Sequence, residues 1–134
     1  MNGPSEQPPL YTRWVEKADH DLTNAEHTLK LEDECPLDTV CFHAQQCAEK
    51  YLKALLCCKG ISFPRTHDLR VLVQAALSVS QLKVDAEATV ALNRYAVETR
   101  YPGDWQEIGR AEAVQAVETA KAVRSAVRAQ LPEM

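Results

Sequence analysis

Basic side chains gather at a few points of this sequence where their spacing suits contact with an anionic ligand. Gln46, Lys50 and Lys53 recur every three or four residues, so a helix would place them on one face. A charged stripe of this kind is more often solvated than ligand-bound, and both interpretations stay open. His67 directly precedes Asp68, whose carboxylate could orient the imidazole toward a phosphate or could instead cap a helix.

Arg100 and Tyr101 form a second candidate anion contact, immediately before Pro102. An arginine at a helix C-terminus is favoured by the helix dipole in any protein. A guanidinium beside an aromatic ring on a turn is equally suited to contact a phosphate or a base. The sequence therefore supports the structural and the ligand-binding interpretation of Arg100 equally.

Two further patterns favour a structural interpretation. His43 and Cys47 lie one helical turn apart, a spacing that can chelate a metal, but no second pair of comparable spacing is evident in the sequence. We therefore expect packing at this pair and no metal site. Lys121, Arg124 and Arg128 could attract RNA by charge alone, but without interleaved aromatic residues we expect a solvated helix face.

The composition limits the classes of function. A chain of 134 residues, 46% hydrophobic and 25% charged, has room for one hydrophobic core. Its net charge of -4 argues against a domain whose whole surface holds nucleic acid. No apolar run approaches the roughly 20 residues of a membrane-spanning helix, so we expect no membrane association. The five cysteines are odd in number and lie partly in apolar helical patterns, which indicates reduced thiols and a cytoplasmic location.

Helices must position these residues, because apolar patterns with a helical period run through most of the chain. The patterns predict two long helices over 12–31 and 37–59, then a shorter third helix capped by Thr66 or Asp68. A fourth helix is predicted over 84–100 and a fifth over 105–131. Gly60 is expected to end the second helix in the left-handed conformation, and the bias of residues before proline ends the fourth at Arg100. Residues 1–11 lack periodicity and are expected to form a flexible tail.

The predicted fold is all-α, an antiparallel up-and-down bundle of four to five helices within one domain over residues 12–131. The helix over 37–59 is expected at the centre because its apolar stripe is the widest, with a polar face of Gln45, Gln46, Glu49, Lys50 and Lys53. The residues expected to face the core are Trp14, Ala18, Leu22, Ala25, Leu29, Val40, Ala44, Cys47, Ala48, Tyr51, Leu52, Leu55, Leu56, Leu69, Leu72, Val73, Ala76, Leu77, Ala88, Ala91, Leu92, Tyr95, Ala96, Val114, Val117, Ala120, Val123, Val127 and Leu131.

Three segments, in order along the chain, carry motifs of a known protein family. Residues 42–56 contain a pair of glutamines followed by a Glu-Lys step and then by Lys-Ala-Leu. Residues 65–69 contain a Thr-His-Asp-Leu element, and residues 99–102 contain an Arg-Tyr-Pro turn. Together they resemble the second helix, the start of the third helix and the turn before the last helix of the HEPN family.

The resemblance implies a helical bundle that usually dimerises. Members of the family act as partners of minimal nucleotidyltransferases, as toxin ribonucleases, or as nucleotide-binding accessory domains. The ribonucleases carry an arginine, four to six residues and then a histidine near the last helices, where the histidine would serve as acid or base. The last histidine here is His67, and the one pair with such spacing, Arg13 and His20, lies in the first predicted helix.

The sequence thus predicts a HEPN-like accessory protein that binds a nucleotide, expected to be a purine nucleotide, or presents substrate to a separate nucleotidyltransferase. We expect a cytoplasmic homodimer with no cofactor, no metal and no catalytic residue of its own, for which RNA is not the expected ligand. The proposed nucleotide contacts are Lys50, Lys53, His67, Asp68, Arg100 and Tyr101. The alternatives are a ribonuclease, using Arg100 with an unrecognised base or the pair Arg13 and His20, and a purely structural dimer.

Overall fold

Helices make up all the regular secondary structure in residues 9–96 and 107–132, which are the residues that the computed structural model describes. The elements are α1 (Leu10–Leu29), α2 (Leu37–Cys58), α3 (Leu69–Val79), α4 (Ala86–Ala91), a 3-10 helix η2 (Leu92–Tyr95) and α5 (Arg110–Arg128). This arrangement confirms the predicted all-α fold class.

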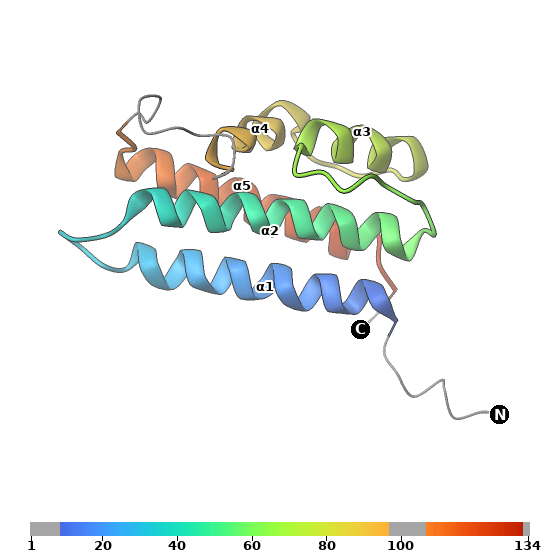
Figure 1. The fold of residues 1–134 in the computed structure, drawn as a ribbon, viewed down its shortest axis with the longest axis horizontal. Coiled ribbons are helices and arrows are strands. Elements are labelled where there is room, and N and C mark those ends of the chain that lie inside the picture. Colours follow the sequence, from blue (N-terminus) through green and yellow to red (C-terminus); the bar gives the residue numbers. More distant parts are fainter. Residues whose placement is uncertain (1–8, 97–106, 133–134) are drawn as a thin grey trace.

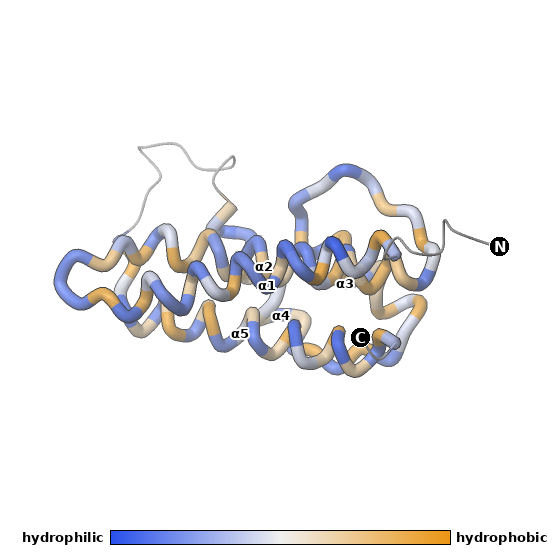
Figure 2. The backbone as a smooth tube through the Cα atoms, turned by 90° about the horizontal axis from the view of Figure 1, so that it is seen from below, coloured by the Kyte–Doolittle hydropathy of each residue, from blue (hydrophilic) through white to orange (hydrophobic). Residues whose placement is uncertain are grey.

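The long helices α1, α2 and α5 lie along one another, with α2 at the centre (Figure 1). A short loop joins α1 to α2, so these two helices run antiparallel, and that loop is largely hydrophilic (Figure 2). The return leg from the end of α2 to the start of α5 contains α3, α4 and η2, which lie on the side of α2 away from α1 (Figure 1). The helix α2 contacts α1, α3, η2 and α5, as its wide apolar stripe predicted.

Several helix ends follow from local sequence. Gly60 has a φ of 72°, which confirms the predicted left-handed end of α2. Asp68 caps α3 by accepting a 2.9 Å hydrogen bond from the backbone N–H of Arg70. The first helix begins at Leu10 and ends at Leu29, so Leu10 and Tyr11 belong to α1 and not to the expected tail. Residues 1–8 lie outside the described part of the chain.

The fourth predicted helix is the main error in the sequence-based boundaries. Instead of one helix over 84–100, α4 ends at Ala91, η2 ends at Tyr95, and Ala96 is extended with a ψ of 122°. Side chains of η2 contact neighbouring elements: Asn93 Oδ1 accepts a 2.8 Å bond from the backbone of Leu69, and the Tyr95 hydroxyl donates to Glu112. The 3-10 turn of η2 thus makes hydrogen bonds to residues far away in the sequence, and the apolar pattern of residues 84–100 contains no sign of them.

The last helix is also shorter than predicted. It begins at Arg110, after Gly109 in an extended conformation, and ends at Arg128 instead of spanning 105–131. Residues 97–106 lie outside the described part of the chain, so the expected turn after Arg100 falls there. The guanidinium of Arg110 donates to the backbone carbonyls of Leu29, Leu31 and Glu32 at 2.7–3.0 Å, which ties the start of α5 to the end of α1.

The core contains nearly all of the predicted inward-facing residues. Three predictions are wrong: Leu77, Ala91 and Val114 are exposed, with Leu77 at 44% and Val114 at 41%. The larger correction concerns the expected polar face of α2, where Gln45 and Glu49 are buried and Lys53 is 7% exposed. Among the described helices, none is long and apolar enough to cross a membrane.

Candidate functional site

A buried carboxylate organises the polar side of α2. Glu49, with its side chain 3% exposed, accepts hydrogen bonds of 3.0 Å from Gln45 Nε2 and from Lys53 Nζ. His67 Nδ1 lies 3.0 Å from Oε2 of the same carboxylate, and because an ionised carboxylate only accepts, the imidazole N–H is the donor. Glu49 therefore holds one amide and two basic groups, which offsets the cost of burying its charge.

Two aromatic rings lie close to the ammonium of Lys53, which also contacts Glu49. The ammonium lies 5.4 Å from the ring centroid of Trp14 on α1 and 6.0 Å from that of Phe63 in the loop after α2. The two rings pack edge to face, with their centroids 6.4 Å apart. Lys53 is thus neither the solvated side chain nor the open ligand contact that the sequence suggested as alternatives; it neutralises Glu49 within an aromatic enclosure.

His67 links this buried network to the surface. Its side chain is 55% exposed, although Nδ1 is bound to the buried Glu49. The backbone carbonyl of His67 lies 3.4 Å from Gln45 Nε2, so both the side chain and the main chain are tied to α2. The imidazole is consequently held in one orientation at the start of α3.

Asp68 has a structural role next to His67. Its Oδ1 accepts bonds from the backbone of Arg70 at 2.9 Å and from Asn93 Nδ2 at 2.8 Å. Asn93 Oδ1 in turn accepts a hydrogen bond from the backbone N–H of Leu69. Asn93 of η2 and the Asp68 carboxylate therefore cap the first turn of α3 together. Of the two interpretations of Asp68, helix capping is the one that its hydrogen bonds display.

Lys50 belongs to a different cluster from Lys53. Its ammonium lies 2.6 Å from Oδ2 of Asp21 on α1, and Oδ1 of that carboxylate lies 2.8 Å from His43 Nδ1. Both basic side chains are 24% exposed. The two lysines of the polar stripe expected on α2 are therefore paired with different carboxylates, Lys50 with Asp21 of α1 and Lys53 with Glu49 of α2 itself.

The thiol of Cys47, which the sequence placed one turn from His43, is buried, and burial raises its pKa. Within the described residues, no group of three or more His, Cys, Asp and Glu side chains could hold a metal ion.

Of the six predicted nucleotide contacts, the structure brings together His67, Asp68 and Lys53. Lys50 is paired with Asp21 instead, and Arg100 and Tyr101 lie outside the residues that the structure describes.

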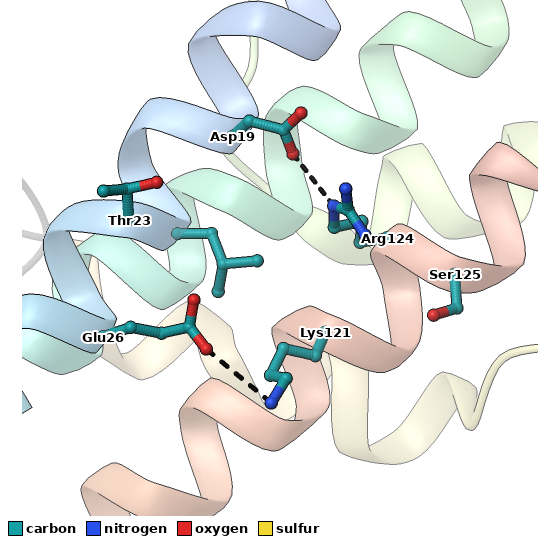
Figure 3. A pocket seen from close by; sticks show the side chains of 7 residues that line it. Asp19, Thr23, Glu26, Lys121, Arg124 and Ser125 are labelled. Atoms are coloured by element: carbon teal, nitrogen blue, oxygen red, sulfur yellow. Dashed lines mark hydrogen bonds and ion pairs between the residues drawn. The ribbon is translucent and has the colours of Figure 1, made fainter.

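A second polar arrangement, which the sequence did not suggest, lies between α1 and α5. A groove of about 490 Å³ is lined by Asp19, Leu22, Thr23, Glu26, Lys121, Arg124 and Ser125. Two ion pairs cross it, Asp19 to Arg124 at 3.0 Å and Glu26 to Lys121 at 3.7 Å (Figure 3). Lys121, Arg124 and Arg128 of α5 were expected to form a solvated face. Their side chains are 37–46% exposed, and each forms an ion pair with a carboxylate of α1.

Tyr51 connects this groove to the core. Its hydroxyl donates a hydrogen bond to Asp19. The pKa of Tyr51 is raised to about 12, mainly because the hydroxyl is buried and secondly because of this hydrogen bond. Arg124 donates from Nε to Asp19, and the carboxylate raises the pKa of that guanidinium. The sequence placed Tyr51 in the core by its spacing, but nothing local indicated that its hydroxyl would meet a carboxylate from another helix.

One protein family and two solved structures match this chain. The family described as HEPN domain matches residues 11–130. The structure is similar to that of TT1696 from Thermus thermophilus, at 28% identity and a TM-score of 0.76, covering 92% of this chain and all of that one. It shares its fold with ST0689, an archaeal HEPN homologue, at 24% identity and a TM-score of 0.71, covering 91% and 98% of the two chains. No curated protein matches this chain.

Proposed function

This chain belongs to the HEPN domain family, and from that premise we propose that it is an accessory protein without ribonuclease activity. In this role it binds a nucleotide, or presents substrate to a separate nucleotidyltransferase. The observation that carries the proposal is the pairing of the buried Glu49 with the half-exposed imidazole of His67. That imidazole lies in the Thr-His-Asp-Leu element through which the sequence resembles the family.

The geometry favours recognition of an anion at His67. A buried carboxylate that already binds Lys53 fixes the ring through Nδ1, so the orientation of the imidazole is set before any ligand arrives. A pre-oriented donor loses less conformational entropy on binding than a flexible surface side chain does. With Nδ1–H donated to Glu49, it is the imidazolium form, in which both ring nitrogens carry a proton, that donates from Nε2 to a ligand. Phosphate oxygens are suitable acceptors for that form, which is why a nucleotide is the proposed ligand.

The proposed contacts are accordingly narrower than the sequence suggested. His67 is proposed to touch the ligand, whereas Lys53 and Glu49 position it and Asp68 caps α3. Arg100 and Tyr101 stay proposed contacts, supported by their Arg-Tyr-Pro motif. A homodimer and a nucleotidyltransferase partner are proposed from the family.

Calorimetric titration of ATP and GTP tests the nucleotide proposal. We expect weak binding by the wild type, in the micromolar to millimolar range, and a loss of about tenfold in His67→Ala, the size of one charge-assisted contact. His20→Ala is the matched control, because His20 is an exposed histidine on α1 outside this network. Absence of heat with both nucleotides, or equal losses in the two variants, would contradict the proposal.

The same Glu49 and His67 pair also favours one alternative, a ribonuclease, because a histidine oriented by a carboxylate can move protons. Labelled RNA incubated with the wild type separates the two functions. We expect no cleavage. Cleavage that disappears in His67→Ala would make His67 the unrecognised base, and cleavage that disappears in His20→Ala would assign it to Arg13 and His20, both of which are exposed on α1.

A further inference from the structure

The groove between α1 and α5 has an uneven distribution of charge. At one end, Asp19 faces two guanidiniums, Arg124 at 3.0 Å and Arg128 at 3.6 Å. At the other end, Lys121 faces two carboxylates, Glu26 at 3.7 Å and Glu118 at 3.6 Å. Counting these groups alone, the first end carries one excess positive charge and the second end one excess negative charge. The excess is supplied by Arg128 and Glu118, which adjoin the groove and do not line it.

The positive end retains donors that can reach a ligand. Arg124 contacts Asp19 through Nε, so this bond leaves the two Nη atoms of the same guanidinium for its contact with Tyr51 and for a ligand. Asp19 is additionally held by the hydroxyl of Tyr51, which keeps the carboxylate and its arginine in place. Ser125, the residue after Arg124, adds a hydroxyl to the lining of the groove.

The negative end can accept a cation. Glu26 has a side chain 44% exposed, and its 3.7 Å separation from Lys121 is longer than a direct hydrogen bond. Such an exposed ion pair contributes little free energy, so a ligand ammonium can replace Lys121 at small cost. Asp19 and Glu26 are seven residues apart on α1, which separates the two ends by about 10 Å along the helix axis.

We infer that this groove binds a small bipolar molecule, with a carboxylate or phosphate at one end and a primary ammonium at the other. The anionic group binds the Nη atoms of Arg124 and the hydroxyl of Ser125, and the ammonium binds Glu26. Leu22 lines the groove between these polar groups and suits an aliphatic spacer. The site lies on α1 and α5 and involves neither Glu49 nor His67, so it is independent of the nucleotide proposal.

Amide chemical shifts in a nuclear magnetic resonance titration test this site with 6-aminohexanoate as the bipolar probe. Hexanoate and hexylamine, which carry only the anion or only the cation on a similar chain, are the matched ligands. We expect saturable shifts at Thr23 and Ser125 with 6-aminohexanoate, and an affinity at least about threefold higher than for either single-charge ligand. 5-Aminopentylphosphonate, which has the same five methylene groups between its charges as 6-aminohexanoate, shows whether a phosphate-like group serves better than a carboxylate.

Two variants locate the ammonium contact. Glu26→Gln should weaken 6-aminohexanoate about three- to tenfold without weakening hexanoate, because only the cationic contact is lost. Glu16→Gln, at an exposed position of α1 outside the groove, should change neither ligand. Equal affinity for 6-aminohexanoate and hexanoate, shifts confined to other surfaces, or no shift at concentrations on the order of tens of millimolar would overturn the inference.

Discussion

Lys53 follows Glu49 by four residues on α2, a spacing that contributes only about 0.2 to 0.5 kcal/mol in a solvated helix. Here both side chains are nearly inaccessible to solvent, at 8% and 3% exposure, and the pair belongs to the interior. In that setting the loss of Lys53 leaves the buried Glu49 charge with only the amide of Gln45 and the imidazole of His67, and the cost is dominated by desolvation. The same two residue types therefore have a different energetic meaning from the one their spacing suggests.

At the residue scale, we predict that Lys53→Ala destabilises the protein by about 3 to 5 kcal/mol, because it leaves Glu49 buried without its ammonium partner. Urea denaturation of wild type and variant measures the difference in the free energy of unfolding. Lys59→Ala, at an exposed position just after α2, is the control and should cost less than about 0.5 kcal/mol. A similarly small loss for Lys53→Ala would mean that Glu49 is solvated in solution.

At the scale of elements, the helix ends that depend on the backbone alone are the easiest to test. Gly60 has a φ of 72°, and a Cβ built there would meet nothing within 4 Å. We predict that Gly60→Ala costs about 1 to 2 kcal/mol, because the left-handed conformation is strained for any residue with a side chain. Thermal or denaturant unfolding measures this cost free of any steric clash.

Gly109 provides the matched control for Gly60. It precedes α5 with a φ of -84°, and an added Cβ would likewise meet nothing within 4 Å. In Gly109→Ala the smaller entropy of the unfolded chain opposes the poorer capping by alanine, so we expect a change within about 0.5 kcal/mol. Equal costs at the two positions would contradict the assignment of the Gly60 effect to its backbone conformation.

At the scale of the whole molecule, the homodimer expected from the family stays a prediction. The apolar stripe of α2 is buried within one chain, against α1, α3, η2 and α5, so a second copy would have to cover another surface. Among the described residues, the large apolar side chains that are exposed lie apart along the chain: Leu10, Leu31, Val71, Leu77 and Val114. A dimer interface formed by the described residues would therefore combine a few of these side chains with polar contacts.

Light scattering coupled to size exclusion measures the assembly directly. We predict a mass twice that of the 15.0 kDa chain at protein concentrations on the order of tens of micromolar. Dilution should convert the dimer to monomer if its interface is as polar as this surface. A mass of one chain throughout that concentration range would refute the prediction.

The sequence by itself determined the features that depend on residues close together in the chain. The helical period placed Tyr51, Leu52 and Leu55 in the core, Gly60 marked the end of α2, and the segment from Thr66 to Asp68 marked the start of α3. Each of these follows from side-chain periodicity or from backbone preferences that act within one or two turns. The three family motifs are likewise contiguous segments, which is why the family could be inferred before the fold.

Only the tertiary structure decided which polar residues are buried and what they meet. The spacing of Gln45, Glu49 and Lys53 is the same whether the facing surface is water or protein. Residues from α1 and the loop after α2, namely Trp14, Phe63 and His67, supply the surface that buries them. The end of the fourth helix and the groove between α1 and α5 depend equally on partners distant in sequence. Burial and charge pairing are properties of packed surfaces, and no local pattern contains the partner.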